Sequence, residues 1–288
     1  MQEATISSRQ GLSATEHKAV RALLDRSNAH DGTALLAALL PSGPTADGTR
    51  HYLLAHLAGE IVGALTLAGY REVEGCGIVL PECRRLGLGR RLVVAASAEV
   101  ARHDLTHWLL TCDEAAPVGA AFAAAVGGMR AFAEYRMTLA APPAPVGNGP
   151  TATLAIRRAT VADAPAIAAI MAGAFGDPLD AVADWLDADL ARDERRWFLA
   201  SLDGVPVGNL RVIAEDDGDY ITAFGVHPAH QRRGHGRALL ASILALLHAE
   251  ERHPVYIEVE TENHTALGLY RACGFVEQQT YSYWRVPV

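Results

Sequence analysis

The sequence predicts an α+β protein that contains two tandem copies of one domain, each with a mixed, mostly antiparallel sheet flanked by helices. Three observations lead to this fold class: a glycine-containing motif that recurs at a fixed offset, a segment rich in proline and glycine between the two copies, and the order of strand-like and helix-like segments in the second copy. With 288 residues, half of them apolar, the chain is long enough for two cores of ordinary size.

Two unrelated signals share an offset of 147 residues. A helix-capping pattern, Ser13-x-x-Glu16, recurs as Thr160-x-x-Asp163. A glycine motif occurs first as Val79-x-Pro81-x-x-Arg84-Arg85-x-Gly87-x-Gly89 and again as Val226-x-Pro228-x-x-Gln231-Arg232-x-Gly234-x-Gly236. Because a capping box and a strand-to-helix loop are independent features, their common spacing indicates an internal duplication.

The two copies are separated by residues 140–150, which include four prolines and two glycines. Proline and glycine oppose both helices and central strands, so this segment is typical of an exposed linker. We therefore expect one domain at 1–139, a linker at 140–152 and a second domain at 153–288.

The expected elements follow from capping, alternation and turn signals. In the first copy, the capping box opens a helix from Ala14 to about Leu24. In the second copy, hairpin turns at Asp203-Gly204 and Asp216-Asp217-Gly218 separate three strands. The expected strands lie at 154–158, 197–202, 205–213, 220–226 and 255–260, with one or two closing strands at 275–286. The expected helices lie at 161–171, 179–190, 236–248 and 265–273, and one helical crossover makes a parallel strand pair.

Composition excludes several classes of protein. The formal charge is −8 and lysine and arginine do not cluster, which argues against a nucleic-acid partner. The polar N-terminal residues are unlike a signal peptide, and the alanine-rich stretch 115–126 is broken by proline and glycine, so we expect no membrane association. Four cysteines without a CxxC pair indicate reduced thiols and a cytoplasmic location.

The second glycine motif predicts an anion site. A strand ending at Val226 is followed by Gln-Arg-Arg-Gly-His-Gly and then by an amphipathic helix, so free amides and the positive end of a helix dipole meet in one loop. A tight strand-to-helix turn would produce the same pattern. A P-loop is excluded because Arg237-Ala238 follow Gly236, and the dinucleotide fingerprint fails at Leu239.

Further motifs in the second copy carry a resemblance to a known family. The loop is followed by Glu258-Val259, by Asn263 and by Leu269-Tyr270-Arg271-Ala272-Cys273-Gly274-Phe275. In this order and spacing, residues 154–286 resemble the GCN5-related N-acetyltransferases (GNAT), and the first copy resembles them more faintly. The whole chain therefore looks like a tandem acetyltransferase, an arrangement similar to that of mycothiol synthase.

The resemblance implies an N-acetyltransferase that moves an acetyl group from acetyl-CoA to the primary amine of a small polar molecule, by direct attack in a ternary complex. The pyrophosphate would lie on the amides of residues 231–236 and the pantetheine arm against the strand 220–226, with the N–H of Val226 at the acetyl carbonyl. The implied cofactor contacts are Val226, Gln231, Arg232, Arg233, Gly234, His235, Gly236, Arg237 and Asn263. No metal is expected.

The resemblance also implies roles in proton transfer. Tyr270 is the expected general acid, and the less favoured alternative is that it packs the last helix onto the sheet. Glu258 is the expected general base, although Glu258 and Glu260 alternate with apolar residues as in any half-exposed strand. Asp219, Tyr220 or a relayed water are the alternatives, since the usual mid-strand position holds Ala223.

Histidines and cysteines near the motif have simpler explanations than metal binding or nucleophilic catalysis. The spacing His227-x-x-His230-x4-His235 matches no helical zinc motif, which favours solvated or loop-packing histidines. Cys273 lies on a helix and is more plausibly a small buried residue than a nucleophile.

The first copy lacks the catalytic box. We pair Tyr270 with Ala124, which cannot protonate a thiolate, so the first domain is expected to be non-catalytic unless another residue such as Tyr135 supplies the acid.

Residues 176–194 carry seven acidic side chains against Arg192 alone and would attract a cationic amine, or would simply form a solvated helix face. A peptide amine as acceptor and a non-catalytic acyl-CoA sensor or scaffold remain alternatives, and nothing in the sequence indicates an oligomer.

Overall fold

The computed structural model describes residues 4–33, 35, 50–69, 72–140, 154–215 and 218–288. It divides into two compact units, one of residues 1–135 with 279–288 and one of residues 136–278. These units differ from the expected division, because residues 136–139 group with the second unit and residues 279–288 with the first. Apart from Ala140, the expected linker lies outside the described residues.

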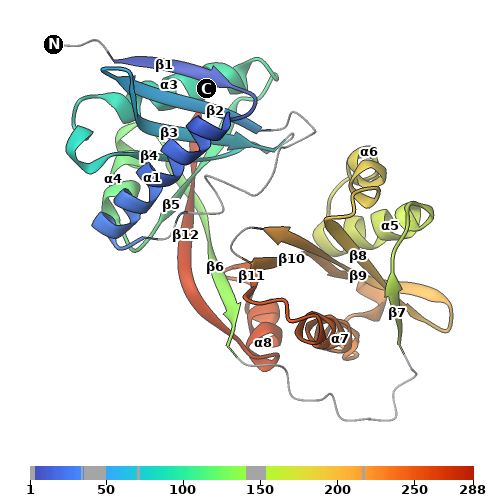
Figure 1. The fold of residues 1–288 in the computed structure, drawn as a ribbon. Helices are drawn as coiled ribbons and strands as arrows, with labels where there is room; N and C mark the ends of the chain where they lie inside the picture. Colours follow the sequence, from blue (N-terminus) through green and yellow to red (C-terminus); the bar gives the residue numbers. More distant parts are fainter. Residues whose placement is uncertain (1–3, 34, 36–49, 70–71, 141–153, 216–217) are drawn as a thin grey trace. The chain divides into compact units, whose positions relative to one another are not determined.

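The first unit contains a mostly antiparallel sheet with helices on both faces (Figure 1). Its elements are β1 (Thr5–Arg9), α1 (Ala14–Asp31), β2 (Arg50–Leu57), β3 (Glu60–Ala68), β4 (Glu74–Val79), the 3-10 helix η1 (Pro81–Cys83), α3 (Leu88–Ala101), β5 (His107–Asp113), α4 (Pro117–Ala125) and most of β6 (Met129–Leu139). Strands β1 to β4 are antiparallel, and β4 pairs with β5 in parallel. The end of the last strand of the chain, β12 (Phe275–Pro287), pairs with β5 over Tyr281–Pro287.

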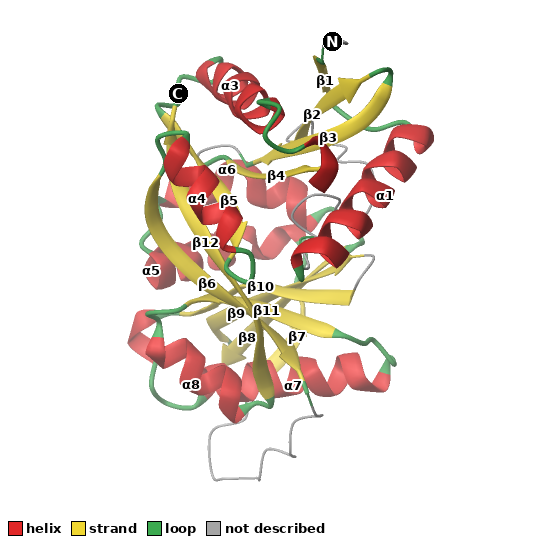
Figure 2. Ribbon diagram, turned by 90° about the vertical axis from the view of Figure 1, so that its left-hand side faces the viewer, coloured by secondary structure: helices red, strands yellow, loops and turns green. Residues whose placement is uncertain are grey.

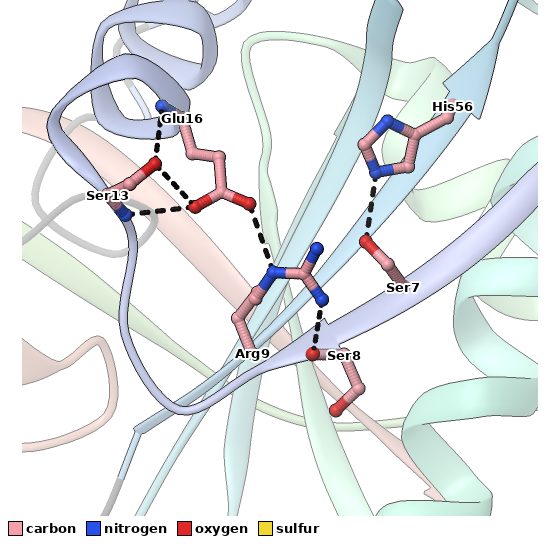
Figure 3. A network of polar contacts seen from close by, with 6 residues as sticks. All are labelled: Ser7, Ser8, Arg9, Ser13, Glu16 and His56. Atoms are coloured by element: carbon pink, nitrogen blue, oxygen red, sulfur yellow. Dashed lines mark hydrogen bonds and ion pairs between the residues drawn. The ribbon is translucent and has the colours of Figure 1, made fainter. Parts of the chain in front are cut away.

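The predicted capping box at Ser13 is confirmed (Figure 3). The Glu16 backbone N–H donates to Ser13 Oγ at 3.2 Å, and the Ser13 backbone N–H donates to Glu16 Oε2 at 2.9 Å. Arg9 Nε donates to the other oxygen of Glu16 at 3.0 Å, which ties the end of β1 to the start of α1. The helix continues past Leu24 to Asp31 because its buried face extends to Ser27, and it ends at the left-handed Gly32.

The second unit repeats this plan. Its elements are β7 (Ala155–Arg158), the 3-10 helix η2 (Val161–Asp163), α5 (Ala164–Phe175), α6 (Leu179–Leu190), β8 (Arg195–Leu202), β9 (Val205–Glu215), β10 (Gly218–Val226), the 3-10 helix η3 (Pro228–His230), α7 (His235–Ala249), β11 (Val255–Glu260) and α8 (His264–Ala272). Strands β7 to β10 are antiparallel, and β10 pairs with β11 in parallel. Helices α5 and α6 cover one face of this sheet, and α7 and α8 cover the other (Figures 1 and 2). The predicted fold class, with two repeats of a mixed sheet flanked by helices, is confirmed.

Most predicted elements occur, with small differences at their ends. The residues after Thr160 form the 3-10 helix η2, and the α-helix begins at Ala164, with a proline in its first turn. Helix α7 begins at His235, one residue earlier than predicted, because Gly234 adopts the left-handed conformation of its N-cap. The C-terminal segment forms one long strand, β12, of 13 residues.

Each unit has its own apolar core. In the first unit the core joins α1 and α3 to strands β2–β5 around the fully buried Trp108. In the second unit one cluster joins α5 and α6 to β8 around Trp197.

The four cysteines are free thiols, and Cys273 is buried as expected. Among the described residues, no helix combines the length and the hydrophobicity that crossing a membrane would require.

Candidate functional site

The loop between β10 and α7 has the geometry of an anion site. Arg232 and Gly234 adopt positive φ angles of 57° and 84°, so the chain turns tightly before the first turn of a 15-residue helix. The side chain of Gln231 fixes the start of the loop, because its Nε2 donates to the carbonyl of Val226 at 3.0 Å. Backbone N–H groups that converge at a helix N-terminus favour a bound phosphate or carboxylate.

The first unit has the same loop conformation. Arg85 and Gly87 have φ angles of 65° and 80°, and Arg84 Nε donates to the carbonyl of Val79 at 3.0 Å, as Gln231 does in the second unit. The guanidinium of Arg84 also forms two hydrogen bonds with Asp31, at 2.8 and 2.6 Å. The duplicated motif therefore corresponds to a duplicated structure.

The two units differ in the strand that leads into this loop. In the second unit the pairing of β10 with β9 shifts register between Thr222 and Gly225, and Ala223 has a φ of 46°. This β-bulge is held by Asn209, whose Nδ2 donates to the carbonyl of Ala223 at 2.6 Å. In the first unit the pairing of β3 with β4 runs from Ala68↔Glu74 to Gly63↔Val79 without a shift.

The bulge lies where β10 and β11 separate. Their parallel pairing covers three residue pairs and ends at Ile221↔Ile257, so the carboxyl end of β10 is not paired with β11. An unpaired strand edge offers backbone donors and acceptors to an extended ligand. The bulged segment, the unpaired edge and the anion loop therefore follow each other within residues 222–236.

Tyr270 lies beside the bulge. Its ring is 6.2 Å from the ring of Phe224, which belongs to the bulged segment, and 6.3 Å from the ring of Phe275. Only 7% of Tyr270 is exposed, and this burial raises the pKa of its hydroxyl. The phenol therefore keeps its proton throughout the neutral range, and the residue both packs the last helix and faces the bulged strand.

The three candidate bases have different surroundings. Glu258 is exposed on β11, one residue beyond the last β10–β11 pair. Asp219 is 2% exposed, and its carboxylate accepts hydrogen bonds from Arg252 at 2.8 and 2.5 Å. Tyr220 is buried against Tyr256, with ring centres 5.1 Å apart. Of these candidates, Glu258 is the one whose side chain reaches solvent.

The other predicted cofactor residues differ in their exposure and contacts. Exposed positions near the loop include Gln231, Arg232, Arg233, Gly234 and Arg237. His235, the first residue of α7, is 7% exposed. The side chain of Asn263 caps α8, since its Oδ1 accepts from the backbone N–H of Ala266 at 3.1 Å.

The histidines around this loop form a row of rings. The ring centres of His227 and His230 are 6.1 Å apart, and those of His230 and His235 are 6.3 Å apart. His227 Nδ1 accepts from the backbone N–H of Ala229 and so caps η3. Within the part of the chain that the structure describes, no group of three or more His, Cys, Asp or Glu side chains is placed to hold a metal ion.

The first unit has a cavity but no counterpart of Tyr270. Counted from the ends of α8 and α4, Tyr270 corresponds to Ala123, a buried alanine next to the predicted Ala124. A cavity of about 480 Å³ is lined by the loop residues Arg84–Arg85 and Gly87, by Thr111 and Cys112 on β5, and by α4. Tyr135 lies half-buried on β6.

The acidic segment before β8 is divided between surface and interior. Asp177, Asp180, Asp184 and Asp187 are exposed around α6. Asp189 is 4% exposed and belongs to the interior, where it accepts from Trp197 Nε1 at 2.8 Å and forms ion pairs with arginines of β8 and β9. The sequence pattern did not separate this carboxylate from its solvated neighbours.

Comparisons with known proteins show the family to which the chain belongs. The family model described as "Acetyltransferase (GNAT) family" matches residues 18–127 and 164–275, one stretch in each copy. A mycothiol acetyltransferase of Clavibacter sepedonicus is 32% identical over 278 residues, which cover 90% of this chain and 88% of that protein. An aminoglycoside N(6')-acetyltransferase type 1 of Stenotrophomonas maltophilia is 32% identical over 153 residues, which cover 50% of this chain and 97% of that protein.

The same fold occurs in solved structures. The structure titled "Tandem GNAT protein from the clavulanic acid biosynthesis pathway (without AcCoA)" superposes with a TM-score of 0.74 at 22% identity, over 99% of this chain and 98% of that chain. This likeness extends along both repeats and concerns the fold.

Proposed function

The chain belongs to the GNAT acetyltransferase family and is an N-acetyltransferase, and from this premise we propose that its second unit transfers an acetyl group from acetyl-CoA to a primary amine of a small polar molecule. The observation that carries the proposal is the position of Tyr270, buried and protonated beside the bulged end of β10. The reaction needs an acid at the departing sulfur, and a tyrosine phenol, which is protonated at neutral pH, can supply one.

Acetyl-CoA would bind along the carboxyl end of β10. Its pyrophosphate would accept hydrogen bonds from the backbone N–H groups of residues 231–236, next to the exposed Arg232, Arg233 and Arg237. Its pantetheine arm would lie as an extra strand on the edge that β11 leaves unpaired. His235, whose ring is buried, would contribute through its backbone, and Asn263 would position α8.

Transfer is a direct attack within the ternary complex. The amine lone pair forms a bond to the thioester carbonyl carbon, and the carbonyl electrons move to oxygen. The backbone N–H of Val226 donates to this oxyanion, and one such donor contributes about 3–4 kcal/mol to transition-state stabilisation. The carbon–sulfur bond then breaks, its electron pair stays on sulfur, and the phenolic proton of Tyr270 neutralises the thiolate.

Glu258 is the proposed acceptor of the ammonium proton, directly or through a water. Its carboxylate is exposed next to the point where β10 and β11 separate. Asp219 is less suited to this role, because both of its oxygens are engaged by Arg252 in the interior. Tyr220 is likewise buried, with its ring packed against that of Tyr256.

The first unit is proposed to be non-catalytic. It keeps the loop conformation and a cavity, which would suit a bound acyl-CoA or a purely structural role. It lacks both the tyrosine and the β-bulge, so neither the acid nor the distorted strand end is present among its described residues.

A small polar amine is the acceptor that agrees best with the names of the matched relatives. One matched relative is named for an aminoglycoside and another for mycothiol, both small molecules. The exposed aspartates around α6 would attract a cationic amine to the second unit. A peptide amine is the alternative acceptor, and a non-catalytic acyl-CoA sensor would not require Tyr270.

Release of free CoA thiol from acetyl-CoA, measured across a panel of amines, tests the proposal. We expect Tyr270→Phe to lower kcat by about 10²–10⁴-fold, the usual contribution of a general acid, while acetyl-CoA binding is retained. Tyr281→Phe is the matched control, since Tyr281 is a buried tyrosine of the first unit. Saturable acetyl-CoA binding by the wild type without thiol release for any amine would favour the sensor instead.

A further inference from the structure

Three side chains of the first unit form a chain of polar contacts that the proposed acetyl transfer does not use. Ser8 Oγ lies 2.5 Å from Nε2 of His51, and Nδ1 of His51 lies 3.3 Å from Oε1 of Glu99. The serine belongs to β1, the histidine to β2 and the glutamate to α3. Hydroxyl, imidazole and carboxylate therefore occur in the order of a serine nucleophile, its general base and the group that orients the base.

Strand pairing and the packing of α3 bring these residues to one face of the sheet. Ser8 pairs with Leu53, and His51 lies two residues before Leu53 on β2, so both side chains point to the same face. Helix α3 packs across β1 and β2 and carries Glu99 in its last turn. The side chains of His51 and Glu99 are 18% and 13% exposed, whereas Ser8 is exposed. A largely buried base is thus joined to a hydroxyl that a reagent can reach.

The carboxylate determines which nitrogen of His51 carries the proton. An ionised carboxylate only accepts hydrogen bonds, so the proton lies on Nδ1, facing Glu99, and Nε2 is left to accept from the hydroxyl of Ser8. The second oxygen of Glu99 accepts from Arg102 Nη1 at 2.7 Å, which fixes the carboxylate in place. The imidazole therefore has the tautomer and the orientation that a general base for Ser8 requires.

The neighbouring Ser7 provides a comparison within the same strand. Its Oγ lies 2.9 Å from Nε2 of His56, and Figure 3 shows the hydroxyls of Ser7 and Ser8 on opposite sides of β1. In the part of the chain that the structure describes, His56 forms no ion pair with a carboxylate of the kind that joins His51 to Glu99. Of the two serine–histidine pairs on β1, one therefore has the third member of the chain.

We propose that Ser8 is an activated nucleophile, a second reactive centre that accepts acyl groups from small esters with a good leaving group. It is separate from the acetyl-transfer site, for which the first unit lacks the acid. Because β1 is the first strand in the order of the described sheet, alternate backbone N–H groups along its outer edge are not used by the sheet. These groups are the donors available to an oxyanion that forms beside Ser8.

The reaction would proceed in two steps. Ser8 Oγ forms a bond to the ester carbonyl carbon while its proton passes to Nε2 of His51, and Glu99 stabilises the imidazolium. The carbon–oxygen bond of the ester breaks, and the leaving alkoxide keeps the electron pair and takes the proton from His51. A water molecule, activated by the same imidazole, then attacks the acyl group and regenerates the hydroxyl of Ser8.

Labelling of the full chain with a fluorophosphonate probe tests whether Ser8 is activated. The serine oxygen forms a bond to phosphorus, and fluoride leaves with the electron pair. Ser7 and Ser8 lie on the same tryptic peptide, which ends at Arg9, so tandem mass spectrometry compares them directly. We expect Ser8 to be labelled at least about 10²-fold faster than Ser7, the lower end of what a general base contributes.

Three variants identify the cause of the labelling. His51→Gln should lower the rate at Ser8 by about 10²-fold or more, and Glu99→Gln by about tenfold or more. His56→Gln is the matched control and should change it by about twofold or less. In the wild type the rate should rise between about pH 5 and 8 as the imidazole loses its proton, and this rise should be absent in His51→Gln.

Release of p-nitrophenolate from p-nitrophenyl acetate tests acyl transfer itself. The wild type should release it at least about tenfold faster than Ser8→Ala, a comparison that also subtracts any reaction at cysteine thiols. Equal labelling of Ser7 and Ser8 would overturn the proposal, as would an unchanged rate in His51→Gln at the wild-type Tm. If His51→Gln does not fold, a wild-type rate that is independent of pH overturns it instead. None of these outcomes depends on acetyl transfer from acetyl-CoA.

Discussion

Asp189 is a carboxylate that the fold keeps in the interior of the second unit. Its oxygens accept from Trp197 Nε1 at 2.8 Å and from Arg211 Nη1 at 2.9 Å, and Arg195 forms a second ion pair. Burial raises its pKa, but the charges and hydrogen bonds of Arg211 and Arg195 outweigh burial and lower the pKa overall. Asp189 therefore connects α6 to β8 and β9 as a charged group.

Removing this carboxylate should destabilise the protein. We expect Asp189→Ala to lower the free energy of unfolding by about 3–5 kcal/mol, because the arginines would be left with an uncompensated buried charge. Asp187→Ala, on the exposed face of the same helix, should change it by about 0.5 kcal/mol or less. Urea denaturation of both variants provides the comparison, and equal effects would show that the buried pair contributes nothing.

The same carboxylate predicts the direction of a pH effect. Because its folded-state pKa lies below the unfolded value, its contribution is present above the unfolded pKa and is lost as the pH falls through the folded pKa. The wild type should therefore lose more stability than Asp189→Ala between neutral and strongly acidic pH. Parallel Tm curves for the two proteins would contradict this.

Among the elements, β10 differs from its counterpart in the other repeat more than the glycine loop does. Gly208 pairs with Val226 in the second unit as Gly63 pairs with Val79 in the first. The next residue is Asn209 in the second unit and Ala64 in the first. The second unit therefore has both the bulge and the asparagine that donates to the carbonyl of Ala223. The described β3 and β4 of the first unit have neither.

Asn209→Ala introduces the alanine that the first unit has at the corresponding position, and it should weaken the bulge. The variant leaves the carbonyl of Ala223 without its donor, so we expect a loss of about 1–3 kcal/mol in stability. Because the bulge positions Val226, acetyl transfer should fall about tenfold or more at a temperature where the variant is folded. Reduced Tm with unchanged kcat would show that the bulge has only a structural role.

Much of the fold could be predicted from the sequence because its signals are local. The capping box at Ser13, the strand Val255–Glu260 and the acidic helix Leu179–Leu190 depend on neighbouring residues and were placed correctly. The bulge depends on pairing between β9 and β10. The offset between the copies also varies, since it is 147 at the glycine motifs and 145 at the β-turns Ala58-Gly59 and Asp203-Gly204.

The site could be predicted only in part for the same reason. The loop around Gly234 and the position of Tyr270 on α8 follow from short motifs. The ion pairs of the buried Asp219 and Asp189 with the arginines at positions 252 and 211 depend on contacts between distant residues. No spacing pattern distinguishes such carboxylates from exposed ones.

At the scale of the whole molecule, the sequence repeats and the compact units do not coincide. Residues 279–288 belong to the first unit, where Tyr283 stacks on Phe132 at 4.5 Å and Val286 is buried. Arg136 belongs to the second unit, where its guanidinium lies 4.0 Å from the ring centre of Tyr256. Each unit is therefore completed by a segment from the other half of the chain.

Deleting residues 279–288 should consequently affect the first unit. Strand β5 would lose its antiparallel partner over Tyr281–Pro287. We expect the amide protons of His107–Asp113 to lose protection in hydrogen exchange, although the deleted residues lie more than 160 positions away in the sequence. Full protection of β5 in the truncated protein would show that the first unit is complete without the C-terminal strand.

We propose that the second of the two similar loops holds the working site. Gly87 and Gly234 have φ angles of 80° and 84°, and a Cβ atom would meet no neighbour within 4 Å at either position. Valine therefore introduces the same backbone strain in both loops. The most direct test is the kcat/KM for acetyl-CoA of Gly87→Val and Gly234→Val. We predict a loss of about tenfold or more for Gly234→Val and about twofold or less for Gly87→Val. An equal or larger loss for Gly87→Val would contradict the account.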